Sequence, residues 1–530
     1  MRRWALVVCG LVLASVAPTV PSPGTWVLVA CATAAILLGT LATADVPPSA
    51  PPSIATASWA AWPEARSLAS PGPFLLGTWP HGAARLYLDE EQLSGHVLVL
   101  GPSRAGKTAG SIATNILLRD PTRESIVVMD VKTGPRALWN VAAGRYGDRA
   151  RLFCPLFEGS IAYNPLEDVR SIGAAQRKAA LLVHNTTPRD LSGDARVYTG
   201  AARDLATLLF LHAQQDRASG NHTVEAVYRL LLEGSAAVRD ALRRSRAPEV
   251  RERHGMFAAR ERRVQEAAVT GLLERLAPWA DPLVCAATAS HWDLGRLGRE
   301  PVALFILLPE DEAHRLQPIV AWLVADLLDG LIAQADREGL RCPVRMYLDE
   351  FRRFGYLSGL SDRLATLRER RVSVVLGLQV LSQLEEVYGA REARTLIGNT
   401  ETKVIFRAGD LETARMTSAW LGNTAVPAVS VTRGERTGRS TTIRPYVRPL
   451  APPEDLVRMP ERAVIVLTGG ARPLALRQAR YYETPGLAAV APPFPLKRRA
   501  APPLAYVPEP CRVGRPARTP APRPSGGVRP

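Results

Sequence analysis

The sequence contains few cysteines, and their spacing argues against two kinds of stabilising site. Six cysteines are scattered over 530 residues without a C-x-x-C pair or a Cys/His pattern, so a zinc site is not indicated. A disulfide framework is typical of short secreted chains, whereas this chain is long enough for two or three domains with a large buried core. A reducing compartment is therefore the simpler inference.

Lysine is also scarce, which gives weight to the lysines that remain. Only five of the 66 basic residues are lysines. Arginine does not replace a compact ammonium group between phosphates, so a lysine kept inside a glycine-rich loop indicates chemistry. Lys107 lies in such a loop. The loop consists of Gly101, Pro102, Ser103, Arg104, Ala105, Gly106, Lys107 and Thr108.

This loop has the surroundings of a phosphate-binding loop. It follows the apolar run Val97–Leu100 and opens a segment with helical periodicity, which is the strand, loop and helix order of a P-loop. In that arrangement backbone N–H groups surround a triphosphate, Lys107 reaches its β and γ oxygens, and the Thr108 hydroxyl binds Mg²⁺. The predicted cofactors are ATP and Mg²⁺. For this motif alone, a glycine-rich turn that matches by chance is the alternative.

Two acidic residues follow a second apolar run. Val344–Leu348 leads directly into Asp349 and Glu350, the arrangement called Walker B. One acid is needed to hold the water shell of Mg²⁺, which fits Asp349, and the other to orient or deprotonate the attacking water, which fits Glu350. A strand that runs into a solvated acidic turn is the alternative, and the upstream loop argues against it.

The N-terminal region predicts a membrane anchor. The apolar stretches Trp4–Val20 and Trp26–Ala44 contain no charged residue. Each has close to the ~20 residues that cross a bilayer. Residues 1–46 therefore read as a two-span transmembrane hairpin. Arg2 and Arg3 precede the first span, so both ends are expected in the cytoplasm. The alternative is a signal peptide that ends near Ala17, but an exported P-loop would lie where ATP is scarce.

The rest of the chain alternates strand-like runs with helical patterns, which is typical of a parallel α/β sheet. A Pro-rich linker is expected over 47–67, followed by the two parts of an ATPase domain, 68–171 and 292–484. Between them, 172–291 shows only helical periodicity and predicts an all-helical insertion. The expected strands are Val97–Leu100, Ile126–Met129, Arg151–Phe153, Val302–Leu308, Val344–Leu348, Val372–Leu378, Lys403–Phe406 and Ala463–Leu467.

The net charge of +16 is distributed unevenly. Residues 485–530 carry eight basic residues and one acidic residue, so nearly half of the excess lies there. Pro, Ala, Gly and Arg dominate this segment without periodicity, and we expect a disordered tail that cannot bury enough apolar surface to fold alone. A basic protein attracts nucleic acid or anionic lipid, and charge alone does not choose between them.

Six stretches resemble the type IV secretion coupling proteins, the TraG-type ATPases of conjugative DNA transfer. The longest block, from Leu348 to Gln383, is more specific than either Walker motif. One departure is Val131, which stands where many relatives have proline. The six stretches are Gly101–Thr108, Val128–Lys132, Tyr163–Leu166, Leu348–Leu357, Val374–Leu384 and Asn399–Phe406.

The resemblance implies a RecA-like ATPase with an all-helical insertion, anchored as a multi-pass protein in the cell (inner) membrane with its ATPase domain cytoplasmic. It also implies a homo-hexamer that recruits a relaxase bound to single-stranded DNA and pumps the DNA into a type IV secretion channel. Gln379 resembles the sensor glutamine, and Arg368 resembles an arginine offered to the ATP of the neighbouring subunit. Arg368 competes for that role with two other arginines in Arg368–Arg371.

Three rival functions remain open on the sequence. An FtsK/HerA-like chromosomal DNA translocase would share both Walker motifs and an anchor, and the block from Leu348 to Gln383 argues against it. A docking receptor whose ATP site only stabilises the hexamer would not need Glu350 as a water-activating acid. A receptor for protein cargo is the third alternative, and no sequence feature opposes it.

Overall fold

The structure is a computed structural model, and it describes residues 56–187, 193–357, 359–434, 438–487 and 489–500. The chain divides into two compact units. The larger unit comprises Trp59–Thr417 and Pro453–Pro530, and the smaller comprises Met1–Ser58 and Ser418–Pro452. The two apolar stretches that predict the membrane hairpin lie outside the described residues.

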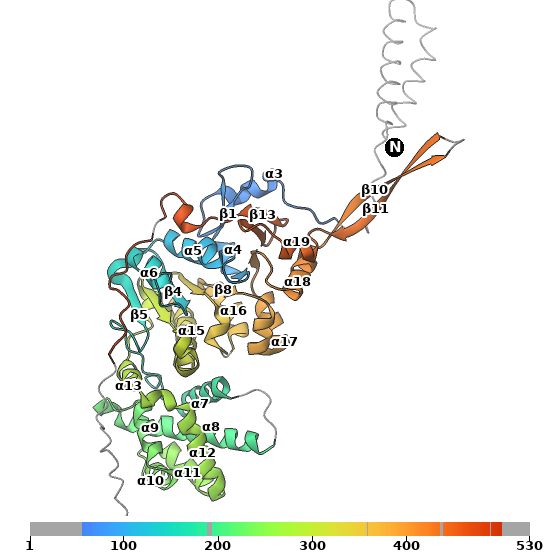
Figure 1. Cartoon of the computed structure of the whole chain (residues 1–530). Coiled ribbons are helices and arrows are strands. Elements are labelled where there is room, and N and C mark those ends of the chain that lie inside the picture. Colours follow the sequence, from blue (N-terminus) through green and yellow to red (C-terminus); the bar gives the residue numbers. More distant parts are fainter. Residues whose placement is uncertain (1–55, 188–192, 358, 435–437, 488, 501–530) are drawn as a thin grey trace, which may run out of the picture. The chain divides into compact units, whose positions relative to one another are not determined.

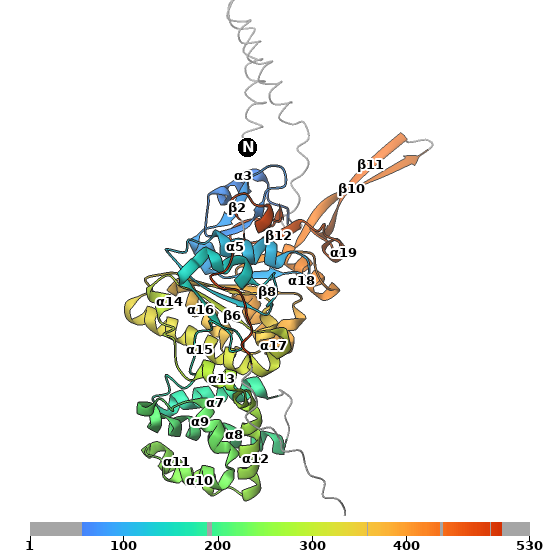
Figure 2. The same cartoon turned by 60° about the vertical axis from the view of Figure 1, so that its left-hand side comes forward.

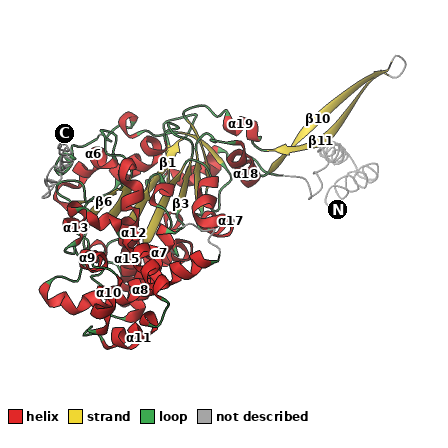
Figure 3. Ribbon diagram, turned by 60° about the horizontal axis from the view of Figure 1, so that its bottom comes forward, coloured by secondary structure: helices red, strands yellow, loops and turns green. Residues whose placement is uncertain are grey.

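The larger unit is built on a sheet of eleven strands in the order β2-β1-β13-β12-β9-β3-β8-β7-β4-β6-β5. Figures 1 and 3 show these strands with helices packed around them. The strands are β1 (Phe74–Thr78), β2 (Arg85–Leu88), β3 (Val97–Leu100), β4 (Ser125–Asp130), β5 (Ala150–Phe153), β6 (Ala303–Leu307), β7 (Val344–Leu348), β8 (Val372–Leu378), β9 (Thr402–Ile405), β12 (Ala463–Leu467) and β13 (Leu474–Arg477).

All eight strands expected from the sequence are confirmed, each within about two residues. Seven neighbours, from β9 to β5, run parallel. Their residues are buried almost without exception, as expected for strands covered on both faces. The sheet is nevertheless mixed, because β12 runs antiparallel to β9 and begins an antiparallel extension through β13, β1 and β2. Of these four strands, the sequence predicted only β12.

The described helices outside the insertion connect and cover these strands. A π-helical turn, η3 (Thr108–Ile112), continues into α5 and starts directly after the glycine-rich loop. The other helices are α3 (Trp62–Ala65), α4 (Glu90–Ser94), α5 (Ala113–Leu118), α6 (Leu138–Ala142), α14 (Arg296–Arg299), α15 (Ala313–Glu338), α16 (Leu360–Leu367), α17 (Ser382–Gly398), α18 (Leu411–Leu421) and α19 (Pro453–Val457).

Helix α15 is a core helix. With the turn before it, it forms the one helix of the described ranges that is long and apolar enough to cross a membrane, and 67% of its apolar window is buried inside the protein. Trp322 lies fully buried on it and donates its indole N–H to the carbonyl of Lys178 at 3.0 Å. Its apolar character is therefore explained by packing.

The insertion is all-helical in its described residues, and Figures 1 and 2 show it grouped at one end of the unit. Helix α7 joins it to α15 through a buried polar cluster in which Asp326 accepts hydrogen bonds from Lys178 and Tyr163. The helices are α7 (Ile172–Thr186), α8 (Asp194–Ala213), α9 (Val224–Leu232), α10 (Ser235–Arg243), α11 (Pro248–Ala258), α12 (Arg262–Arg275) and α13 (Pro282–Thr288).

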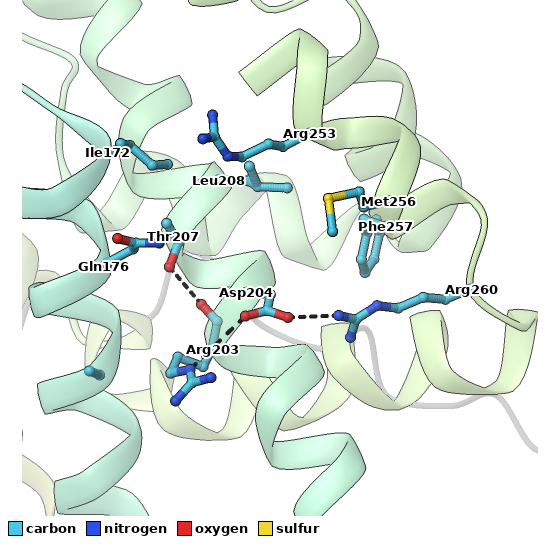
Figure 4. Close-up of a pocket in the computed structure, with 11 residues that line it drawn as sticks. Ile172, Gln176, Arg203, Asp204, Thr207, Leu208, Arg253, Met256, Phe257 and Arg260 are labelled. Carbon is cyan, nitrogen blue, oxygen red and sulfur yellow. Dashed lines mark hydrogen bonds and ion pairs between the residues drawn. The ribbon is translucent and has the colours of Figure 1, made fainter. Parts of the chain in front are cut away.

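A groove of about 430 Å³ opens between α7, α8 and α11. Figure 4 shows Met256 and Phe257 pointing toward Leu208, with Arg253 and Arg260 at the rim. The arginine-rich stretch that the sequence places around 251–263 is thus divided. Arg253 and Arg260 line this groove, whereas the side chain of Arg262 is 86% exposed and forms a surface ion pair along its own helix.

The smaller unit contains a long antiparallel hairpin that the sequence did not predict. Its strands are β10 (Asn423–Gly434) and β11 (Gly438–Pro449), with Asn423 opposite Pro449 and Gly434 opposite Gly438. Two prolines face each other across it, Pro427 and Pro445. Proline within a run argues against a central strand, so the sequence did not predict these strands. In a two-stranded sheet, however, each strand has a sheet edge along most of its length.

The beginning of the predicted tail differs from the expectation of disorder. Residues 489–500 run along the larger unit, where the ring of Phe494 lies 4.8 Å from that of Trp139. The Trp139 indole donates to the carbonyl of Phe494 at 3.1 Å, and the N–H of Arg499 donates to the carbonyl of Leu156 at 2.8 Å. A single aromatic anchor and backbone pairing order this segment, although it has no periodicity.

Two truncations should separate the contribution of residues 489–500 to stability from that of the basic residues after position 500. A chain that stops after Ala500 keeps the contacts of Phe494 and should retain the thermal midpoint of the full chain. A chain that stops after Thr484 uncovers Trp139 and should unfold at a midpoint lower by about 1–2 °C, because a loss of ~1–2 kcal/mol shifts a unit of this size by about 1 °C per kcal/mol. Equal midpoints in differential scanning calorimetry would contradict the stabilising role of residues 489–500.

Candidate nucleotide-binding site

The glycine-rich loop connects β3 to η3 and contains backbone conformations with positive φ. Gly106 has φ +104° and Arg104 has φ +66°, and a side chain at Gly106 would come within 2.4 Å of the Gln478 amide oxygen. Lys107 is 4% exposed, and its ammonium group donates to the carbonyls of Gly101 at 2.6 Å and Pro102 at 3.3 Å. The loop thus folds around the lysine that it presents.

The predicted acids meet this loop because parallel strands end at the same edge of the sheet. Asp349 is fully buried at the end of β7, and its Oδ2 accepts a hydrogen bond from the Thr108 hydroxyl at 2.7 Å. Glu350 Oε1 lies 3.9 Å from Lys107 Nζ. Gln379, which follows β8, donates its side-chain amide to Glu350 Oε2 at 2.8 Å. Five residues predicted from distant motifs are therefore neighbours.

Glu350 has an unusual backbone conformation. It lies in the left-handed region, with φ +52° and ψ +48°. A non-glycine residue there is uncommon, costs free energy and is often found at functional sites. The conformation lets the chain turn sharply after Asp349, so that the two acids are directed differently. One is buried against Thr108, and the other is held by Gln379.

Two further charged residues, Lys132 and Asp130, lie beside Asp349. The Lys132 ammonium donates to Asp349 Oδ2 at 2.9 Å and to the Thr108 hydroxyl at 3.2 Å. Burial opposes charge on Lys132, but the carboxylates of Asp349 and Asp130 outweigh it, and the pKa of Lys132 is raised. Burial lowers the pKa of Lys107, against the opposing effect of Glu350.

The donor set fits a hard divalent cation. A threonine hydroxyl and a carboxylate oxygen lie 2.7 Å apart beside the loop, and oxygen ligands are those that Mg²⁺ prefers. The Lys132 ammonium contacts both oxygens, so a positive charge is already accommodated at this position. Among the described residues, no cluster of three or more His, Cys, Asp or Glu forms a separate metal site.

The pocket contains residues that the motifs did not reveal. A cavity of about 650 Å³ lies beside the loop, and residues between 461 and 482 of the larger unit line part of it. Gln478, just after β13, donates its amide to the carbonyl of Ala105 at 3.0 Å. Arg480 pairs with Glu461 at 2.8 Å. The cavity is also lined by Arg136, Glu461, Arg480, Tyr481 and Tyr482. The adjacent tyrosines were the only sequence signal, and no known spacing links them to a P-loop.

Arg368 lies away from this pocket in its own chain. It precedes β8, whereas Gln379 follows β8, and seven strand residues span roughly 20 Å. The Arg368 guanidinium lies 3.1 Å from a carboxylate oxygen of Glu401. A role toward the ATP of a neighbouring subunit does not require Arg368 to reach its own pocket, so that role stays a prediction.

Comparison with known proteins points to one family. The family model described as "Type IV secretory system Conjugative DNA transfer" matches residues 64–501. Protein VirD4 of Rhizobium rhizogenes is 26% identical over 402 residues, covering 73% of this chain and 58% of VirD4. Conjugal transfer protein TraG of Escherichia coli is 27% identical over 405 residues, covering 69% of this chain and 62% of TraG. The chain thus spans about three fifths of these relatives.

Solved structures share the fold. The bacterial conjugative coupling protein TrwB, lacking its N-terminal 70 residues, superposes with a TM-score of 0.65 at 19% identity, covering 83% of this chain and 95% of that chain. A structure of TrwB in complex with ADP and Mg²⁺ gives a TM-score of 0.63 at 18% identity, with coverages of 83% and 95%. The α/β architecture expected from the sequence, RecA-like with a mostly parallel sheet, is therefore confirmed.

The buried carboxyl of Asp130 predicts a pH dependence of stability. Burial, and next the charge of Asp349, raise the pKa of Asp130 to about 7, whereas an unfolded aspartate ionises near about 4. Between these values the folded chain binds the extra proton, so the contribution of Asp130 to the free energy of unfolding falls as pH rises. In the absence of nucleotide and Mg²⁺, the wild type should therefore lose free energy of unfolding relative to Asp130→Asn as the pH rises from 5 to 8.

Urea unfolding at both pH values measures this difference. Asp120→Asn is the control, because Asp120 is exposed and hydrogen bonds from Thr122 lower its pKa, so its ionisation is complete by pH 5. A difference for Asp130→Asn that is constant, or that shifts in favour of wild type, would show that this carboxyl is already ionised in the folded chain at pH 5.

Proposed function

The chain belongs to the type IV secretory system conjugative DNA transfer family, and from this membership we propose that it is the coupling ATPase of a type IV secretion system. It hydrolyses ATP to move single-stranded DNA, delivered with a relaxase, into the secretion channel. The observation that carries the proposal is the meeting of Lys107, Thr108, Asp349, Glu350 and Gln379 in one pocket. A site built only for binding would not need the acid held by Gln379.

The geometry supports a division of labour. Lys107 and the loop from Gly101 to Thr108 bind the phosphates of ATP, and Thr108 and Asp349 would hold Mg²⁺, Asp349 through water. Glu350 positions the attacking water and takes up its proton, while the Gln379 amide keeps the Glu350 carboxylate in place. Mg²⁺, when bound, offsets the charge that develops on the phosphate oxygens.

A homo-hexamer accounts for Arg368. Because Arg368 is remote from the pocket of its own chain, it can serve only a neighbouring one, where it would offset charge in the transition state. An arginine supplied in this way is worth ~10³–10⁵ in rate in comparable systems, so assembly would control activity. The competing pair with Glu401 is half exposed and costs little to break.

Two other cargoes are compatible with the same ATPase. A chromosomal DNA translocase would use the same pocket, but family membership favours conjugative transfer. A receptor for protein cargo would keep the ATPase and replace the DNA. Stimulation of hydrolysis by single-stranded DNA distinguishes the proposal from the protein-cargo alternative.

Two substitutions test the assignment of Lys107 and Glu350. Lys107→Ala should weaken nucleotide binding, because it removes a ground-state phosphate contact. Glu350→Gln should still bind ATP, while steady-state hydrolysis, with and without single-stranded DNA, falls by about 10²- to 10⁴-fold, the usual contribution of general base catalysis. Both variants should fail in mating assays that count DNA transfer.

Lys497→Ala is the matched control, because it removes a lysine whose side chain is 70% exposed and which is far in the sequence from Lys107 and Glu350. It should hydrolyse ATP as the wild type does. Wild-type hydrolysis by Glu350→Gln would remove Glu350 from the mechanism, and a wild-type enzyme whose rate does not respond to DNA would favour the protein-cargo alternative.

We further propose that residues 1–46 form a two-span hairpin in the inner membrane and that the ATPase domain is cytoplasmic. The support is the length of the two uncharged stretches and the position of Arg2 and Arg3 before them. A reporter enzyme fused after Pro52 should be active only as a cytoplasmic fusion, and the N-terminus should remain uncleaved. Recovery of a mature chain that starts near Pro18 would instead establish a signal peptide.

A further inference from the structure

A short turn connects the proposed catalytic acid to a cleft on the protein surface. The turn is the 3₁₀ helix η8 (Phe351–Phe354), which begins immediately after Glu350. Phe351 is fully buried and stacks on Tyr388, with ring centroids 5.7 Å apart. The next two residues, Arg352 and Arg353, are 36% and 48% exposed. The same four-residue turn therefore has one side chain in the core and two cations at the surface.

These cations line a cleft of about 320 Å³, which we name the η8 cleft. Its walls come from the end of α7, the start of α15, η8 and α17. The imidazole of His184 stacks on the ring of Tyr356, with centroids 3.9 Å apart and an angle of 29° between the planes. The side chains of His184, Gln317, Arg352, Arg353 and Tyr356 line this cleft.

The combination of guanidinium groups with a flat aromatic surface suits a single-stranded nucleic acid. A guanidinium group can bind two oxygens of one phosphate at once. An aromatic face can stack on any of the bases. Glu386 and Glu310 now neutralise the arginines, with Arg352 at 2.8 Å from Glu386 and Arg353 at 3.9 Å from Glu310. Both glutamates are more than 60% exposed. Such surface pairs contribute little, so a phosphate can replace the carboxylate.

The turn is fixed at both of its ends. Before it, the Glu350 carboxylate is held by Gln379. After it, the Gln317 amide donates to the carbonyl of Phe354 at 3.2 Å and to Asn185 at 2.9 Å. A Cβ at Gly355 would lie 1.9 Å from the same amide, so this contact requires glycine. A turn held in this way moves as one piece rather than bending inside.

The Tyr388 hydroxyl strengthens this connection. It accepts a hydrogen bond from the N–H of Leu357 at 3.1 Å and donates to the carbonyl of Gly355 at 3.4 Å. Its ring also contacts that of Tyr356, with centroids 5.1 Å apart. Tyr388 therefore touches both the buried start of η8 and the aromatic wall of the cleft.

We propose that the η8 cleft binds the phosphate backbone of single-stranded DNA through Arg352 and Arg353, and that η8 couples this binding to the position of Glu350. The inference rests on the proposed function, because it names the place where the translocated strand contacts the ATPase. A base stacks on the pair formed by Tyr356 and His184. Hydrolysis that displaces Glu350 moves both arginines, and a bound strand in turn holds Glu350 in its working position.

The test compares two pairs of consecutive arginines in the full chain. In R352A/R353A the cleft loses both phosphate ligands. R243A/R244A, on α10, removes two arginines that are 68% and 72% exposed and is the matched control. Binding of fluorescein-labelled oligothymidylate is followed by fluorescence anisotropy between 50 and 200 mM salt. Each lost phosphate contact should make the log–log slope of affinity against salt about 0.7 shallower.

We expect R352A/R353A to bind the oligonucleotide several-fold more weakly, with a slope shallower by about 1.4, and to lose most of the stimulation of hydrolysis by DNA. R352K/R353K keeps both charges and should restore the slope. R243A/R244A should bind as the wild type does.

Failure of the cleft and failure of the proposed function give different results. If the wild type binds oligothymidylate and R352A/R353A binds it with the same affinity and slope, the cleft is not the site, although the function stands. If the wild type does not bind oligothymidylate even at 50 mM salt, both proposals fall. Retained oligothymidylate binding with loss of labelled polyglutamate binding by R352A/R353A would assign the cleft to an acidic protein segment and overturn the proposal.

The coupling is tested by Tyr388→Phe, which removes only the hydroxyl between Leu357 and Gly355. This variant should bind oligothymidylate with wild-type affinity, and its hydrolysis should respond less to DNA. Circular dichroism checks that it is folded. Wild-type stimulation in Tyr388→Phe would show that η8 does not transmit binding to Glu350.

Discussion

The predicted nucleotide pocket is organised around one fully buried carboxylate, that of Asp349. A buried charge is tolerated only when it is paired and hydrogen-bonded, and here Thr108 and Lys132 supply the partners. The buried charge of Asp349 also affects Asp130, at the end of the neighbouring strand β4. Burial, and next the charge of Asp349, raise the pKa of Asp130 to about 7. A divalent cation beside Asp349 would add positive charge there and favour the ionised form of Asp130.

This arrangement depends on the parallel part of the sheet. The strands β3, β4, β7 and β8 are neighbours and end at one edge, so that Lys107, Asp349, Glu350 and Gln379 converge although 272 positions separate the first from the last. Glu350 accepts a strained backbone conformation at this edge. Strain of this kind persists only where the surroundings fix it, and Gln379 on one side and η8 on the other do so.

The antiparallel extension gives the pocket its second wall. Gln478 follows β13 and donates its amide to the carbonyl of Ala105, which ties the C-terminal part of the larger unit to the glycine-rich loop. Tyr481 and Tyr482 follow directly and line the cavity. Neither residue belongs to a motif with a fixed distance from the loop, and their place depends on strand order. The hairpin of β10 and β11 escaped prediction for a different reason, since two prolines interrupt its β-pattern.

The sequence by itself determined the parallel core and the helical insertion, and it placed the glycine-rich loop and the two acids at strand ends. These follow from local signals, such as buried apolar runs, glycine spacing and acids at a strand end, which depend on a few neighbouring residues. The tertiary structure alone decided that Lys132 meets Asp349, that Gln379 holds Glu350, and that Phe494 orders a segment without periodicity. Such contacts join residues far apart in the chain, so they are set by strand order and packing, for which a linear pattern carries no signal.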